Sequence, residues 1–203
     1  MKGLLLKDLI NLKSTARLFL AFLVVFVVLI LATGDLGSYS LSIILLSAML
    51  PFTTMALDER AKWDRTALAA PVKRSTLVLS KYVLGLLLLL VALFAGLILG
   101  VIGGEEIGVL LVQLFTLALS GVLMLCVMLP LMFRFGAEKG RILLMLIMAA
   151  LFAASFALRT PDFILPGGDE LMDYAPILLA SVLAVLALSM LWSIRIYHKK
   201  DFS

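Results

Sequence analysis

The chain has 203 residues, of which 64% are hydrophobic, and 17 Lys and Arg against 13 Asp and Glu give it a formal net charge of +4. Long apolar runs with basic residues gathered in alternate gaps exclude an ordinary soluble domain and are typical of an integral membrane protein. The excess of basic residues fits contact with anionic lipid headgroups, so it does not indicate nucleic-acid binding. The single Cys126 excludes a disulfide framework.

An amphipathic helix is predicted at the N-terminus, lying along the cytoplasmic membrane surface before the first span. Its apolar face holds Leu5, Leu9, Leu12 and Ala16, and its polar face holds Lys7, Asp8, Asn11 and Ser14. The alternative is an ordinary juxtamembrane segment without a function of its own.

Six apolar runs follow, each near the roughly 20 residues that cross about 30 Å of hydrocarbon. They are 18–33, 40–57, 83–102, 107–133, 142–158 and 174–192. The first run lacks a small-residue cleavage site, so it is expected to remain as a span. The fourth is long and contains Pro130, which predicts a tilt or a bend. The prediction is an all-α integral membrane protein in which residues 1–203 form one transmembrane domain of six helices.

The basic residues sort to one side of these runs. Sixteen of the 17 lie in the N-terminal segment, the connections after the second and fourth runs, and the tail; the exception is Arg159. Both termini are therefore expected to be cytoplasmic. The other side holds Asp35, Glu105, Glu106, Asp162, Asp169, Glu170 and Asp173. These acidic residues are explained by the sorting of basic residues to the cytoplasmic side. The alternative explanation is that they attract a cationic substrate.

The spans, by these boundaries, contain no Asp, Glu, Lys, Arg or His. A transporter driven by protons or ions usually needs ionisable groups inside the bilayer. The chain also lacks the G-x-x-x-x-G-K-[ST] motif that binds nucleotide phosphates, and no nucleophile has a base at a suitable spacing. The only histidine, His198, lies in the basic tail. We therefore expect no catalytic residue, metal or cofactor on this chain, and an energy source outside it.

The connection after the second span predicts a short cytoplasmic helix over 58–69, because acids lead at its start and Ala70 and Pro71 end it. Trp63 lies among charges and is either a contact for a partner protein or an anchor at the headgroup level. The flanking charges favour the partner. Candidate docking residues are Asp58, Glu59, Arg60, Lys62, Trp63, Asp64 and Arg65. Farther on, Lys81 and Tyr82 are expected to reach from the membrane boundary toward the headgroups.

Small and polar residues recur at helical spacing within the spans. Ala92, Gly96 and Gly100 predict a ridge that another helix approaches closely, within one subunit or between two. Polar side chains that could line a pathway, or instead bond between helices, are Ser47, Thr54, Gln113, Thr116 and Ser120. The adaptable thioethers of Met124, Met128 and Met132 could grip a peptide or simply pack in the core.

Several stretches together resemble the permease subunits of type-2 ABC exporters. They are the opening 1–10, Asp58–Pro71 with Ser80–Tyr82, Phe135–Arg141 and Ser193–Asp201. The resemblance covers essentially the full length. It is greatest to the small six-span branch that includes membrane subunits of phenol-soluble modulin and antimicrobial-peptide exporters.

The resemblance implies that the segment near Asp58–Ala69 is a coupling helix, which docks in a groove of a separate ATPase subunit. A second cytoplasmic contact is expected at Glu138, Lys139 and Arg141. Two permeases, identical or paralogous, would pair with two ATPases that bind ATP and Mg²⁺. The expected location is a bacterial plasma membrane.

The expected cargo is an amphipathic or hydrophobic peptide such as a toxin or an antimicrobial peptide. Lipid, drug or polysaccharide export is the alternative, as is a sensor or assembly subunit that transports nothing. The long outer connection Arg159–Asp173 has no assigned role.

Overall fold

The computed structural model describes residues 3–4, 6–8, 10–11, 21, 24–25, 28, 50–61, 63, 73–158 and 174–199. These residues form helices, turns and short connections, and no strand occurs among them, which confirms the all-α prediction for this part of the chain. The long helices are α4 Arg74–Gly103, α5 Ile107–Phe135, α6 Ala137–Leu158 and α8 Ala175–Lys199. Residues 50–60 are also helical, as are the described residues from 3 to 11.

Three of these helices, α4, α5 and α8, are long and apolar enough to cross a membrane. The number six for the spans stays a prediction, because most of 18–33 and 40–49 lies outside the described residues, as does Arg159–Asp173. Residues 50–57 of the second expected span are helical and continue without a break through Arg60.

The helices extend beyond the apolar runs that predicted them. Helix α4 begins at Arg74 rather than Val83, and α8 continues to Lys199 rather than ending at Trp192. Hydropathy marks where the apolar stretch stops, whereas a helix continues as long as its polar residues find partners or water. The additional turns carry the polar residues that form the candidate site.

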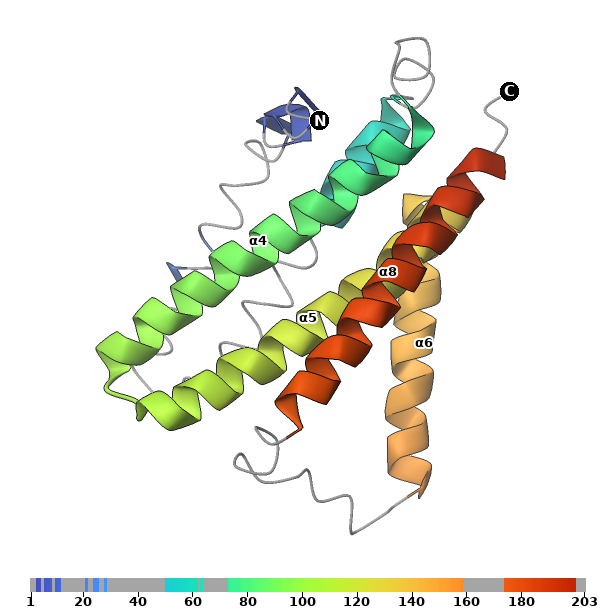
Figure 1. Ribbon diagram of the computed structural model, residues 1–203. Helices are drawn as coiled ribbons and strands as arrows, with labels where there is room; N and C mark the ends of the chain where they lie inside the picture. The colour runs from blue at the N-terminus through green and yellow to red at the C-terminus, as the bar shows by residue number, and fades with distance from the viewer. Residues whose placement is uncertain are drawn as a thin grey trace.

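Helix α5 is central: it packs against α4, α6 and α8, and α4 also packs against α8. Figure 1 shows α4, α5 and α8 running along one another, with α6 leaving the end of α5 at an angle. One residue, Gly136, separates α5 from α6, and its φ of 86° is a left-handed conformation that favours glycine.

The predicted ridge of small residues on α4 faces α5. A Cβ placed on Gly96 would lie 3.2 Å from Cδ2 of Leu114, and one on Gly100 would collide with the side chain of Leu110. Ala92 is buried in the same cluster as these two leucines. The ridge therefore serves close packing of two helices within the subunit.

The methionines of α5 also pack in the core. Met128 and Met132 are only 1% and 3% exposed, in a cluster with Phe52 and Ala137, and Met124 packs against that cluster. Of the two interpretations of this stripe, the structure favours core packing.

Candidate functional site at the basic end

Several helices meet at one end of the bundle, which we call the basic end (Figure 1). They contribute the start of α4, the ends of α5 and α8, the start of α6 and the end of helix 50–60. Nη1 of Arg74 donates a hydrogen bond to the backbone carbonyl of His198 at 2.8 Å, which joins α4 to α8. The rings of Phe133 and Tyr197 meet edge-to-face, with centroids 5.6 Å apart, which joins α5 to α8.

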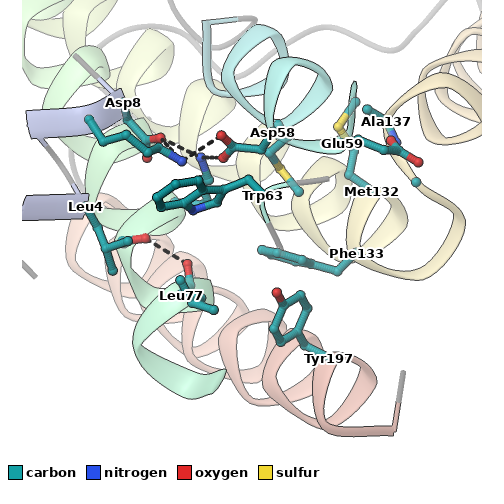
Figure 2. Close-up of a pocket in the computed structure, with 15 residues that line it drawn as sticks. Leu4, Asp8, Asp58, Glu59, Trp63, Leu77, Met132, Phe133, Ala137 and Tyr197 are labelled. Carbon is teal, nitrogen blue, oxygen red and sulfur yellow. Dashed lines mark hydrogen bonds and ion pairs between the residues drawn. The ribbon is translucent and has the colours of Figure 1, made fainter. Parts of the chain in front are cut away.

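Four charged side chains meet inside the basic end, and we call them the ionic cluster: Lys7, Asp8, Asp58 and Lys81. Nζ of Lys81 lies 2.8 Å from Oδ1 of Asp8 and 2.6 Å from Oδ2 of Asp58. Nζ of Lys7 lies 2.6 Å from Oδ1 of Asp58 and 3.2 Å from Oδ1 of Asp8. The cluster ties three segments together: the N-terminal helix, helix 50–60 and α4 (Figure 2).

The ionic cluster is largely removed from solvent. Its side chains are 21%, 1%, 10% and 10% exposed in chain order. Two ammonium groups balance two carboxylates, which is the condition for burying charge at an acceptable cost. Nζ of Lys81 also donates to Oγ1 of Thr54 at 3.4 Å, so all three of its N–H groups have acceptors.

This arrangement corrects two expectations from the sequence. Lys81 does not extend toward the headgroups, because two carboxylates hold its ammonium group inside the bundle. On the polar face of the N-terminal helix, Lys7 and Asp8 are turned into the protein rather than toward water, because they complete the cluster. Leu6 and Ile10 are instead 59% and 61% exposed.

Trp63 packs inside the basic end. It lies against the cluster of buried residues around Tyr82 and Phe133, and Nζ of Lys7 is 4.5 Å from its ring centroid, a cation–π contact. Its Nε1 is buried and has no hydrogen-bond acceptor among the described residues. The role of Trp63 as a partner contact or as a headgroup anchor stays a prediction.

A cavity of about 60 Å³ borders the ionic cluster and is also lined by Trp63, Phe133 and Tyr197 (Figure 2). It is large enough for a few water molecules, and its polar lining offers them hydrogen-bond partners. Local packing beside the charges is therefore incomplete.

The next residues along helix 50–60 contact α6. Oε2 of Glu59 accepts a hydrogen bond from the backbone N–H of Ala137 at 2.6 Å, where the positive end of the α6 dipole favours a carboxylate. A Cβ on Gly136 would lie 2.5 Å from Oε1 of the same side chain, so a larger residue here would displace this carboxylate. Glu59 thus fixes helix 50–60 to the start of α6.

Arg60 and Glu138 lie side by side on the outside of this junction. Nη2 of Arg60 is 3.9 Å from Oε1 of Glu138, and the two side chains are 77% and 82% exposed. Lys139 and Arg141 are exposed on the following turn of α6. Residues of both predicted cytoplasmic contacts therefore form one surface. Lys62, Asp64 and Arg65 lie outside the described residues.

The candidate pathway residues separate into different roles. Thr54 is fully buried, donates to the carbonyl of Pro51 at 2.7 Å and belongs to the surroundings of the ionic cluster. The hydroxyls of Thr116 and Ser120 donate to carbonyls of their own helix, α5. Oε1 of Gln113 is buried without a partner among the described residues. Ser47 lies outside them.

A second polar network was not predicted. The hydroxyl of Tyr82 lies 2.7 Å from Oγ of Ser189 and 2.8 Å from Oγ of Ser193, and Ser189 donates to the carbonyl of Cys126 at 2.6 Å. These bonds join α4, α8 and α5. The spacing of the two serines, i and i+4 in an apolar run, was the available signal, since it places both hydroxyls on one helix face.

The pairing within the ionic cluster was missed as well. Asp58 and Lys81 stand at the two ends of one connection, each beside an apolar run, and this was the signal for an ion pair. Asp8 came from a different segment and had no such signal.

The chain was compared with known proteins. A family model described as "ABC-2 family transporter protein" matches residues 3–198. No curated protein and no solved structure matches the chain. Because the match covers nearly the whole sequence, this helical membrane protein belongs to the ABC-2 transporter family, as a permease subunit.

Proposed function

We propose that this permease exports amphipathic or hydrophobic peptides, and that its ATPase partner docks on the exposed surface formed by Arg60, Glu138, Lys139 and Arg141. ABC-2 permeases work with an ATPase subunit in general, which supplies the energy for transport. ATP and Mg²⁺ bind to that partner. Two permeases, identical or paralogous, form the transport unit, with both termini in the cytoplasm.

The observation that carries the docking proposal is the joined surface itself. Arg60 and Glu138 are strongly exposed, and residues of both signs lie on it, so it offers a partner several charge-assisted contacts. Glu59 attaches the end of helix 50–60 to α6 directly beneath it. A partner that pushes on this surface therefore moves two helices as one piece.

Charge reversal tests the docking surface. Arg60→Glu and the double variant Arg60→Glu/Glu138→Arg are expressed together with the partner ATPase subunit. The double variant retains an opposite-charge pair within the chain, so only the charges presented to the partner are reversed. We expect both variants to lose most of the co-purified ATPase and of the permease-stimulated ATP hydrolysis.

The matched control is Arg195→Glu, which reverses an exposed charge on α8, a helix that contributes no residue to this surface. It is expected to leave association unchanged. Undiminished association of both surface variants would contradict the docking proposal.

The peptide cargo follows from the resemblance to peptide exporters. The described spans also offer a mixed surface, with apolar residues on α4 and α8 and the polar groups of Thr116 and Ser120 exposed on α5. Such a surface suits an amphipathic chain better than a strongly polar polysaccharide.

Transport in vesicles tests the cargo. The permease and its ATPase are reconstituted together, and ATP-dependent accumulation of a fluorescent amphipathic helical peptide is followed beside a fluorescent phospholipid and a hydrophobic dye. We expect accumulation of the peptide to require ATP. Movement of the lipid or dye alone would overturn the peptide proposal in favour of lipid or drug export. ATP hydrolysis with no probe moved would favour a sensor or assembly subunit.

A further inference from the structure

We infer that the ionic cluster is the joint that transmits movement from the ATPase-docking surface to α4, with the bond between Asp58 and Lys81 as its essential link. This inference rests on the proposed docking at Arg60 and Glu138. The two aspartates and two lysines are then positioning residues, which act through the helices that they join.

The first step is the place of Asp58. It immediately precedes Glu59 and Arg60 on the same helical segment, yet its side chain is buried whereas theirs are exposed. One turn of helix therefore presents its outer side to the docking surface and its inner side to the ionic cluster. A displacement imposed on the outer side must move Asp58.

The second step is the way Asp58 is bound. Its two carboxylate oxygens contact different ammonium groups at the same short distance of 2.6 Å: Oδ1 contacts Lys7, and Oδ2 contacts Lys81. Separating either pair inside the bundle would leave an uncompensated buried charge. When Asp58 moves, the two ion pairs therefore stay intact. The helices that carry Lys81 and Lys7, which are α4 and the N-terminal helix, then move with it.

The third step leads from Lys81 into the membrane-spanning bundle. Helix α4 continues from Lys81 to Gly103 as one helix, so a shift at its start reaches the opposite end. The neighbouring Tyr82 is bonded to Ser189 and Ser193 of α8. Movement that starts at the docking surface would therefore enter α4 at Lys81. It would reach α8 through the adjacent residue, Tyr82.

The cavity supplies the room that a moving joint needs. It borders all four members of the ionic cluster, where a tightly packed interior would resist their displacement. A purely structural anchor for the N-terminal helix would gain nothing from such a space.

Two double variants separate transmission from anchoring. Asp58→Asn/Lys81→Met removes the link and leaves Lys7 and Asp8 as a neutral pair. Lys7→Met/Asp8→Asn removes the same number of charges and leaves the link intact. Each keeps the cluster neutral, so neither strands a buried charge.

Movement is read at the far end of α4. Ile102, which is 67% exposed, is replaced by Cys on a Cys126→Ala background and labelled with an environment-sensitive fluorophore. The complete complex with its ATPase is placed in nanodiscs, and the change in emission on adding ATP and vanadate is measured. Co-purified ATPase is measured in parallel.

We expect Asp58→Asn/Lys81→Met to retain its ATPase but to lose most of the emission change, whereas Lys7→Met/Asp8→Asn keeps it. Lys81→Arg retains the positive charge and is expected to keep the emission change. Lys73→Met alters an exposed lysine just before α4 and is expected to keep the emission change as well. An equal response in the two double variants would overturn the joint. Loss of the response in Lys7→Met/Asp8→Asn would overturn it too, whether or not Asp58→Asn/Lys81→Met folds. If the permease without these double variants did not co-purify with an ATPase, that result would instead refute the proposed function.

Discussion

Two helical glycines of this chain, Gly100 on α4 and Gly108 on α5, have different surroundings, and the difference gives a prediction at the scale of single residues. A Cβ on Gly100 would collide with Leu110, whereas one on Gly108 would meet nothing within 4 Å. Overpacking costs about 1–3 kcal/mol, and replacing a helical glycine by alanine contributes about 0.8–1 kcal/mol in the opposite direction. We therefore expect Gly100→Ala to lower the stability of the purified permease by up to about 2 kcal/mol, and Gly108→Ala to leave it equal or higher.

Chemical or thermal unfolding in detergent measures both variants. The double variant Gly100→Ala/Leu110→Ala identifies the source of the loss, because removing the leucine also removes the collision. The two changes are then expected to be non-additive by about 0.5–3 kcal/mol. Equal shifts for Gly100→Ala and Gly108→Ala would refute close packing of α4 on α5 at this point.

At the same scale, the sequence predicted residues that matter at the basic end but not what they contact. Asp58, Glu59 and Trp63 are all among the residues predicted to dock a partner. In the structure Asp58 pairs with lysines from two other segments, and Glu59 accepts a bond from Ala137. Such pairings depend on which distant segments the fold brings together, and neither spacing nor composition contains that information.

At the scale of helices, apolar runs predicted α5 and α8 to within a few residues at the ends nearer the acidic connections. The basic ends were less predictable. Lys81 interrupts the apolar run two turns into α4, so hydropathy predicts a span that begins after it. A lysine inside a helix is compatible with the bundle once Asp8 and Asp58 balance its charge, and that balance exists only after three segments have assembled.

The helical scale also explains how the basic end is held together. Each element contributes a polar contact at its last or first turns: Arg74 to His198, Glu59 to Ala137, and the ionic cluster between α4 and helix 50–60. Polar bonds that connect helices of one subunit stabilise a membrane bundle where apolar packing alone gives little preference for one arrangement.

At the scale of the whole molecule, the alternation of basic and acidic connections agrees with the geometry. Arg74, Arg134 and His198 lie on helix turns at the basic end, and the connection between α4 and α5 at the opposite end carries Glu105 and Glu106. The positive-inside rule therefore predicts an orientation with the basic end in the cytoplasm and the acidic connection outside.

Cysteine labelling in intact cells tests this orientation. On a Cys126→Ala background, Glu106→Cys places a thiol in the exposed connection between α4 and α5, and Lys199→Cys places one at the exposed end of α8. We expect a membrane-impermeant maleimide to label Glu106→Cys in intact cells, and Lys199→Cys only after the membrane is opened. The reverse pattern would place the surface around Arg60 and Glu138 outside the cell, where no ATP-consuming partner could reach it. Docking at that surface and transmission through Asp58 and Lys81 would then both be excluded, because each requires this surface to face the cytoplasm.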